Sequence, residues 1–357
     1  MTNRVQIGLV FIIINLSFGY LVYPNLIYMI AKTAHWEVVM YQCLLQLFLI
    51  KIYIKGLNYF PDYDVIDIFK RMGKWVAFIL LTPLLINLIA LFAFNIRLHT
   101  DVIISIFLNK TPYWSIMSLF LFISVYTAVK GIGTILRSSL FLFLVIIPLV
   151  VFNIATSVVN FDFHNIRPTW DLSHKFLLNE KFIHLLGFSP FLFLGFIKSN
   201  KKWKFSKLFL LCLITFIFFL SVVYIPIFIF GQETVNSLTY PFLEAMDSVD
   251  ISWFPFNRQS IFFGISLVGL VILANAVILW MIGRIMLKIF KFNEKNCSYW
   301  IIAFSLIAFI FAKFTPNKSV FEKYFLWCMA AQAYYMIIIP FTIFIYGFIS
   351  EKRRVKL

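Results

Sequence analysis

The chain is 357 residues long, of which 62% are hydrophobic and only 13% are charged. Soluble domains average about 45–50% apolar and about 25% charged residues, and disordered chains have low hydrophobicity, so the composition excludes both classes. The net charge of +16 at pH 7 is typical of loop lysines and arginines that orient a membrane protein and meet anionic lipid headgroups. We therefore predict an all-α polytopic membrane protein.

A helix that crosses a bilayer needs about 20 mostly apolar residues, and ten segments of the chain are candidates. In chain order they are Gln6–Ala31, Val38–Ile54, Trp75–Ile96, Trp114–Val129, Ser138–Val159, Phe182–Ile197, Phe205–Phe230, Ile261–Met286, Ser298–Ala312 and Tyr324–Ile349. We expect one integral membrane domain over residues 1–357, with about ten transmembrane helices in two five-helix repeats at residues 5–159 and 182–349. No cleavable signal peptide is expected, because no small-residue motif follows the long first run.

Lysine and arginine are unevenly divided between the two sides of this predicted bundle. Of the 31 such residues, 21 lie at the termini or in every second connection, and 10 lie in the other connections. Positive charge collects on the cytoplasmic side of membrane proteins. Both termini are therefore predicted to be cytoplasmic.

Three connections are longer than tight turns. Asn58–Lys74 mixes three aspartates and three basic residues with apolar residues, which favours an amphipathic helix at the cytoplasmic surface over a solvated loop. Asn160–Lys181 and the acidic Gly231–Gln259 are expected on the outer side.

Two spans contain helix-breaking residues near mid-membrane. The first contains Asn15-Leu16-Ser17-Phe18-Gly19-Tyr20 and then Pro24, and the sixth contains Gly187-Phe188-Ser189-Pro190 and then Gly195. Interrupted segments at equivalent places in two halves are typical of inverted-repeat transporters with a site at the midplane. We therefore expect a 5+5 inverted repeat with broken helices 1 and 6.

The backbone exposed at two such breaks could bind a small zwitterion such as an amino acid. Free amides and the positive ends of half-helices attract a carboxylate, and free carbonyls accept from an ammonium group. Asn87 and Asn275 are added because spans three and eight line the midplane site in such folds. The predicted ligand-binding residues are Ser17, Phe18, Gly19, Tyr20, Asn87, Gly187, Phe188, Ser189, Pro190 and Asn275. The alternative is that Gly, Ser and Pro here only allow close helix packing.

None of the predicted spans contains Asp or Glu, although Glu37 and Glu180 lie just outside two of them. Proton-coupled carriers usually need an ionisable residue inside the membrane, so this absence favours a sensor over a proton-coupled transporter. Sodium coupling through carbonyls and hydroxyls stays open. The other intramembrane amides are interpreted as interhelical hydrogen-bonding groups; they are Asn15, Gln42, Gln46, Asn95, Asn153 and Gln332.

No catalytic chemistry is indicated. The sequence has no Walker loop, no HExxH or GxSxG motif and no paired carboxylates in a span, so an enzyme is not expected. The four cysteines form no CxxC or His/Cys cluster, which predicts neither a metal site nor a disulfide framework. No cofactor is indicated, and no module for binding nucleic acid is present.

The order of several short motifs resembles a known family. The motifs are Gln6, Pro24, Ala34-His35-Trp36, Pro61, Gly73-Lys74, Thr111-Pro112, Tyr126-Thr127-Ala128-Val129-Lys130-Gly131-Ile132 with Arg137, Asn165-Ile166-Arg167-Pro168, and Tyr240-Pro241 through Asp250-Ile251 to Arg258. Over nearly the whole chain they resemble the GerAB-type spore germination proteins, the permease-like B subunits of nutrient-germinant receptors in the amino acid–polyamine–organocation superfamily. Gly133 and Asn257 stand where that family usually has an acid.

The resemblance implies a protein of the inner membrane of a bacterial spore. It implies a subunit that senses a small nutrient, often an amino acid, and acts with a membrane A subunit and a lipoprotein C subunit. Two alternatives remain open at this point: an amino-acid transporter of the same superfamily, and a membrane scaffold that binds no nutrient.

Overall fold

The computed structural model describes residues 4–108, 110–171, 174–198, 202–250, 259–290, 296–315 and 318–355. The ordered elements among these residues are helices, and no β-strand occurs in the described part of the chain. The predicted all-α class is therefore confirmed.

The helices follow the predicted spans in order. The α-helices are α1 (Arg4–Gly19), α2 (Tyr23–Ile30), α3 (His35–Asn58), α4 (Val65–Met72), α5 (Lys74–Ile106), α6 (Tyr113–Val129), α7 (Ile132–Ser157), α8 (Glu180–His184), α9 (Phe205–Phe230), α10 (Pro241–Asp247), α11 (Ser260–Ile289), α12 (Cys297–Phe314) and α13 (Lys318–Val355). The 3-10 helices are η1 (Val158–Asn160), η2 (Phe163–Ile166), η3 (Lys175–Leu178), η4 (Leu185–Phe188), η5 (Leu192–Phe196) and η6 (Thr234–Ser237).

Seven of the described helices are long and apolar enough to cross a membrane: α3, α5, α7, α9, α11, α12 and α13. The bent pair of α1 and α2 makes an eighth if it is counted as one span. The fourth predicted span is the 17-residue α6, and the sixth is divided among the short helices α8, η4 and η5. Length and apolarity thus support seven or eight spans, and the exact count of ten is not confirmed.

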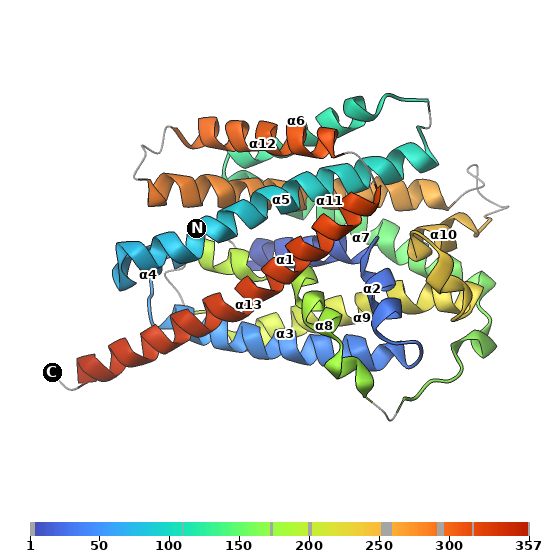
Figure 1. Ribbon diagram of the computed structural model, residues 1–357, viewed down its shortest axis with the longest axis horizontal. Coiled ribbons are helices and arrows are strands. Elements are labelled where there is room, and N and C mark those ends of the chain that lie inside the picture. Colours follow the sequence, from blue (N-terminus) through green and yellow to red (C-terminus); the bar gives the residue numbers. More distant parts are fainter. Residues whose placement is uncertain are drawn as a thin grey trace.

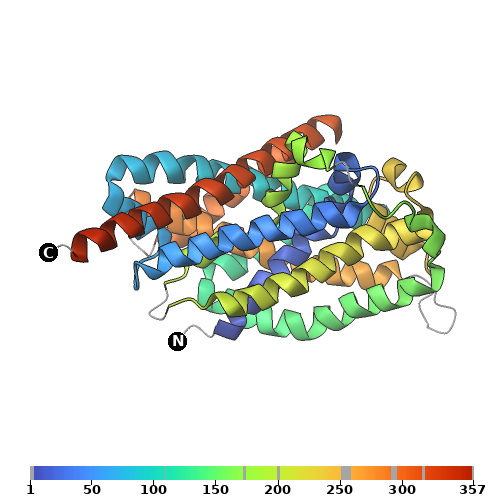
Figure 2. The same ribbon diagram turned by 90° about the horizontal axis from the view of Figure 1, so that it is seen from below.

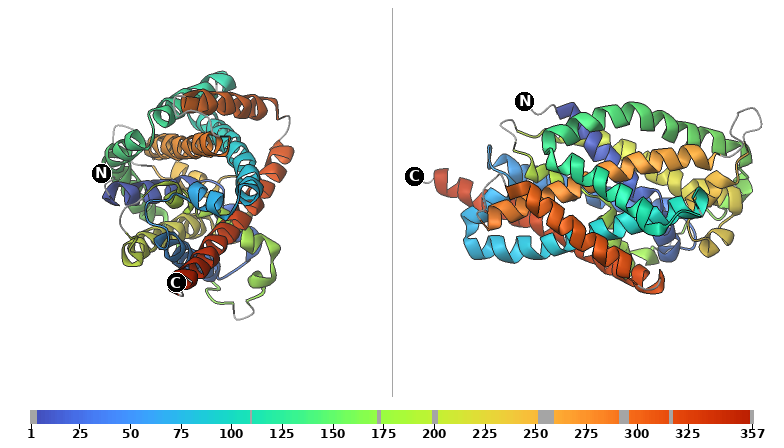
Figure 3. Two further views of the ribbon diagram at one scale, coloured as in Figure 1. Left: turned by 90° about the vertical axis from the view of Figure 1, so that its left-hand side faces the viewer. Right: turned by 90° about the horizontal axis from the view of Figure 1, so that it is seen from above.

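Most long helices run along the long axis of the bundle, and α13 crosses it obliquely (Figure 1). From below, α3 and α9 lie in front (Figure 2), and from above α6 and α12 do (Figure 3, right). The helix α11 packs against α1, α5, α6, α7 and α12, and 21 of its 30 residues are buried. Both chain ends lie toward the same end of the bundle, which we call the terminal end; α2 and α10 lie at the opposite, far end (Figure 1).

The segment Asn58–Lys74 contains the expected helix, α4, at the terminal end (Figure 1). Its apolar residues Val65, Ile66, Ile68 and Phe69 are buried. Asp64 caps its amino terminus by accepting a hydrogen bond from the Asp67 backbone N–H at 3.0 Å. The interpretation as an amphipathic helix is confirmed for these eight residues.

The described parts of the two expected outer connections lie at the far end with α2 (Figures 1 and 2). The first begins at the end of η1 and contains η2 and η3, and the second contains η6 and α10. Ile251, Asn257 and Arg258, which belong to the family-like motif after Tyr240-Pro241, lie outside the described residues. Gly133 lies in the first turn of α7, and its side-chain position faces open space.

Candidate functional site

The first break separates α1 from α2, whose axes differ by 61°. Helix α1 continues through Gly19, so the break falls at Tyr20–Val22, slightly later than expected, and Ser17 and Phe18 are helical. Pro24 explains why the second helix begins where it does. Proline lacks an N–H and is tolerated in the first turn of a helix, and α2 begins one residue before it.

The second break lies between η4 and η5, at Ser189-Pro190-Phe191. Both flanking elements are 3-10 helices, so no α-helical ladder runs through Leu185–Phe196. Buried carbonyls freed at such a break need other partners. The predicted interruption of helix 6 is therefore present.

Gln42 of α3 joins the two breaks. Its side-chain oxygen accepts a hydrogen bond from the hydroxyl of Tyr23, the first residue of α2. Its side-chain nitrogen donates to the Leu185 carbonyl at 3.1 Å and lies 3.3 Å from the Ser189 hydroxyl. The rings of Tyr23 and Phe188 also meet, with centroids 5.5 Å apart. The two breaks thus face each other, and Gln42 satisfies polar groups from both.

A small internal cavity lies beside the breaks. It has a volume of about 20 Å³, and Phe18 of α1 and Pro190 of the second break line it with residues of α5, α11 and α13. Gln332 of α13 provides a polar lining group. A volume of this size holds about one water molecule, which is less than an amino acid needs. In this conformation the space between the breaks is closed.

Gly19 and Gly187 are not among the residues that line that cavity. A methyl group on Gly19 would come within 2.6 Å of the Phe219 ring, and one on Gly187 within 2.9 Å of the Met329 carbonyl. Both glycines therefore allow close packing, against α9 and α13 respectively, which was the alternative interpretation.

Six more predicted residues are not among those that line the cavity, namely Ser17, Tyr20, Asn87, Phe188, Ser189 and Asn275. Tyr20 is buried in an aromatic cluster, with its ring centroid 5.1 Å from those of Phe218 and Phe263. Asn87 donates to Gln332 at 2.7 Å. Asn275 is fully buried, and both polar atoms of its side chain lack a hydrogen-bond partner among the described residues.

A larger pocket opens at the far end, with a volume of about 410 Å³. Helix α2, the outer part of α5, residues Thr239-Tyr240 and the start of α13 line it. Its charged groups are Arg97 and Asp101, one helical turn apart on α5. The Arg97 guanidinium donates to the carbonyls of Ala312 and Thr315 at 2.6 Å each, which fixes it at the carboxyl end of α12.

Three aromatic rings in contact lie between the far-end pocket and the breaks. Phe94 and Phe325 line the pocket, and their centroids are 4.1 Å apart. Phe325 also contacts Phe188 of the second break, at 5.9 Å. These three residues, which we call the aromatic partition, form a thin apolar layer between the pocket and the break.

Arg97 and Asp101 are not among the predicted site residues, because the third span was expected to end at Ile96. Helix α5 in fact continues to Ile106. Arg97 and Asp101 are spaced i and i+4, and residues at that spacing fall on one helix face. This spacing was the signal in the sequence that the helix continues beyond Ile96.

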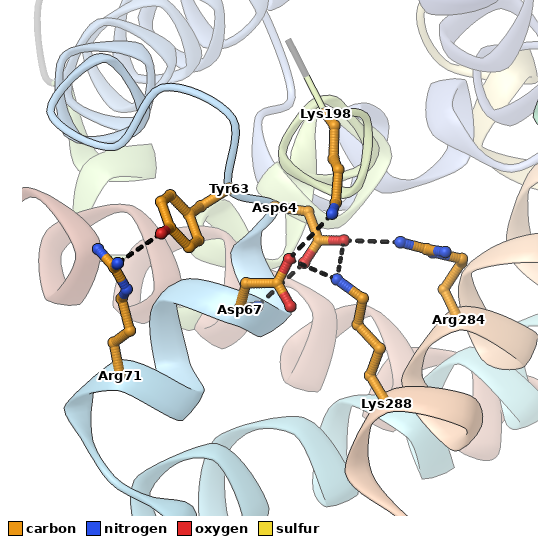
Figure 4. Close-up of polar contacts among 7 residues, drawn as sticks. All are labelled: Tyr63, Asp64, Asp67, Arg71, Lys198, Arg284 and Lys288. Atoms are coloured by element: carbon orange, nitrogen blue, oxygen red, sulfur yellow. Dashed lines mark hydrogen bonds and ion pairs between the residues drawn. The ribbon is translucent and has the colours of Figure 1, made fainter. Parts of the chain in front are cut away.

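A cluster of charged residues lies at the terminal end (Figure 4). The fully buried Asp64 accepts from Arg284 at 2.8 Å and from Lys288. Asp67 pairs with Lys288 at 2.6 Å and with Lys198 at 3.6 Å. Since Lys198 follows η5, the cluster ties α4 and α11 to the segment beyond the second break.

The charges around Asp67 shift its titration. Partial burial by itself raises the pKa of the carboxyl, but the hydrogen bond and charge of Lys288 and the charge of Lys198 outweigh it, so the pKa is lowered below its ordinary value. The ion pairs with Lys288 and Lys198 therefore stabilise the ionised form of the Asp67 carboxyl.

Comparisons with known proteins agree with the fold and with the motifs. A family model described as "Spore germination protein" matches residues 3–321. "Spore germination protein YndE" of Bacillus subtilis (strain 168) is 25% identical over 195 residues, which is 52% of this chain and 52% of that protein. The match thus spans about half the length of the curated relative.

A solved structure shares the architecture. It is the crystal structure of the Eremococcus coleocola manganese transporter in complex with an aromatic bis-isothiourea substituted compound. The two structures align with a TM-score of 0.59 and 14% sequence identity, over 93% of this chain and 76% of the transporter. At that identity the likeness is one of fold alone.

Proposed function

Because the chain belongs to the spore germination protein family, we propose that it is a nutrient-sensing membrane subunit of a spore germinant receptor. Its nutrient is a small zwitterion such as an amino acid, which reaches the breaks from the far end. Its partners are an A and a C subunit, and its place is the inner membrane of the spore with both termini in the cytoplasm. The fold and the family are those of a permease-like membrane protein.

The observation that supports this proposal most is the bridge made by Gln42. One amide side chain bonds to Tyr23, which directly follows the first break, and to Leu185 and Ser189, which lie before and at the second. A ligand that competes for these groups would disturb both breaks at once, and differential binding to two arrangements is what shifts an equilibrium between them.

The route for the nutrient is the far-end pocket. A pocket of about 410 Å³ falls within the usual range of small-molecule sites, roughly 300–1,000 Å³, and Arg97 and Asp101 supply one charge of each sign. The nutrient would bind there first and would pass on to the breaks only when the aromatic partition moves. Release toward the terminal end would require the Asp64 cluster to open.

Thermal stability of the purified protein tests the proposal. Titration with a panel of amino acids should raise the melting temperature for one or a few of them, because a ligand bound only by the folded state stabilises it. Gln42→Leu should abolish that rise. If no member of a broad nutrient panel shifts the wild-type protein, the scaffold alternative is correct.

A second candidate function is transport of the nutrient across the membrane. It is favoured by the fold that the chain shares with a transporter. Uptake of a labelled amino acid into vesicles separates the two. A sensor should show saturable binding without accumulation inside, whereas accumulation would favour the transporter.

A further inference from the structure

Helix α3 holds the backbone on both sides of the second break by side chains of one helix face. Before the break, the Gln42 side chain donates to the Leu185 carbonyl at 3.1 Å. After the break, the Tyr53 hydroxyl donates to the Leu192 carbonyl at 2.9 Å. Gln42 and Tyr53 are about three helical turns apart, so both lie on the same face of α3. The break is therefore bonded to α3 where it lacks a helical ladder of its own.

Gln46 lies on this same face, between the two anchoring side chains. It follows Gln42 by one turn, and residues at i and i+4 share a helix face. Gln46 is only 2% exposed, and its side-chain nitrogen has no hydrogen-bond partner among the described residues. A buried donor without a partner destabilises a fold. Any arrangement that brought a carbonyl of the break to Gln46 would therefore gain a bond that the present one lacks.

A shift of the second break by one turn of α3 would produce such an arrangement. The break segment runs in the same direction as α3, because its earlier part contacts Gln42 and its later part contacts Tyr53. A shift toward the terminal end would therefore carry Leu185 and Ser189 from Gln42 to Gln46. One turn rises about 5.4 Å, and one-turn steps of an element past its neighbour occur in switching proteins. The bond from Tyr53 would break in the same step.

We propose that Gln42 and Gln46 are two alternative binding positions for the second break, and that a one-turn shift between them is the conformational switch of this protein. In the present structure Gln42 bonds to groups of both breaks, and the cavity beside them is small. After the shift Gln42 would keep Tyr23 and Gln46 would hold the second break, so the two breaks would separate. The use of this switch in sensing rests on the function proposed above, whereas the shift itself requires no nutrient.

The experiment measures the distance between two spin labels by double electron–electron resonance, in the purified full-length protein without nutrient. One label is attached at Ile183→Cys, which is 50% exposed on α8 just before the segment that shifts. The other is attached at Lys55→Cys, an exposed position on α3. The native cysteines are replaced first. Because Lys55 lies on the terminal-end side of Gln42, the shift should shorten this distance by up to about 5 Å.

Two identical substitutions, one turn apart, should act in opposite directions. Gln42→Leu should raise the ratio of the shorter to the longer distance by on the order of 5- to 30-fold, because only the unshifted arrangement loses its bonds to the break. Gln46→Leu should lower that ratio, because only the shifted arrangement loses them. Gln332→Leu is the matched control, since it removes a buried amide that bonds to Asn87, and it should leave the ratio unchanged. If Gln42→Leu does not fold, Gln42→Asn, which shortens the reach of the same amide, takes its place.

Two outcomes would overturn the proposal. A single distance in the wild type and in all variants would mean that the break does not shift. A change of the same sign in Gln42→Leu and Gln46→Leu would mean that Gln46 only fills space on α3. The sensor function fails separately: a protein that shows both distances but binds no nutrient retains the switch without sensing, whereas nutrient binding with a single distance leaves the sensor and refutes the switch.

Discussion

The side-chain nitrogen of Gln42 lies 3.3 Å from the hydroxyl of Ser189, and these two residues connect an unbroken helix to the break in its neighbour. Both side chains are buried, so each polar group has only protein to bond with. In a helix pair of this kind an amide side chain performs the role that backbone hydrogen bonds perform elsewhere.

Gln42→Leu should therefore destabilise the protein by about 1–3 kcal/mol. The substitution leaves buried groups of Tyr23, Leu185 and Ser189 without this partner. The measurement is the free energy of unfolding or the melting temperature in detergent. Gln46→Leu is the matched control: Gln46 lies about one turn away on the same helix and is buried, and its side-chain nitrogen has no partner among the described residues. Equal losses in the two variants would contradict the bridging role.

Gly19 should tolerate no side chain. A methyl group there would lie 2.6 Å from Phe219 and 2.8 Å from Phe218, so Gly19→Ala must displace packed rings, and overpacking of this kind costs about 1–3 kcal/mol. Gly133→Ala is the control, since nothing lies within 4 Å of that position. We expect a lower melting temperature for the first variant only. Loss of nutrient response from Gly19→Ala at unchanged melting temperature would restore the ligand-facing role.

The sequence predicted the two breaks well, because Gly, Ser and Pro act locally on the backbone. It also predicted that α4 is amphipathic, because periodicity reports burial of one face. It did not predict what the glycines face. That depends on Phe218 and Phe219 in α9 and on Met329 in α13, which only the tertiary arrangement brings to them.

The charged residues show the same limit. Asp64 was expected at a surface, yet it is fully buried, and its partner Arg284 is 220 residues away in the chain. The third span was also predicted to end at Ile96, because the charge of Arg97 lowers the local hydropathy of the sequence there. Helix α5 passes that point and places Arg97 in the far-end pocket.

Removal of one ring of the aromatic partition should open the second break to the far end. We expect Phe325→Ala to raise the rate at which an impermeant thiol reagent, added from the far-end side, labels a cysteine introduced by Ser189→Cys. The native cysteines are replaced first. The reason is that Phe325 contacts both Phe94 of the pocket and Phe188 of the break.

Phe122→Ala is the control for this experiment, because Phe122 is 69% exposed on α6 and belongs to no partition between cavities. It should not change the labelling rate. If Phe325→Ala also has no effect, the nutrient route does not pass through these rings.

Asp64→Asn should destabilise the terminal end strongly. Removing one partner of a buried ion pair costs about 3–5 kcal/mol, because it leaves the other charge uncompensated. Here Arg284 loses its carboxylate partner, and Lys288 loses one of two and keeps Asp67. Unfolding monitored by protease cleavage at this end should show the loss. Asp62→Asn, at an exposed position two residues earlier, should change stability by no more than about 0.5 kcal/mol; a similar loss there would mean that charge in the loop matters and the cluster does not.

The contribution of Asp67 should depend on pH in a stated direction. Its pKa is lowered in the folded protein, where Lys288 and Lys198 outweigh the effect of burial, relative to an ordinary value of 3.8. A depressed carboxyl pKa adds stability that is fully present above the ordinary value and is lost as pH falls through the folded pKa. Asp67→Asn removes this term. The melting temperature of wild type should therefore exceed that of the variant at pH 7 and pH 5, and the gap should shrink below pH 3.8. A gap that stays constant down to pH 3 would show that Asp67 acts through packing or neutral hydrogen bonds and that its charge does not hold α4 to α11.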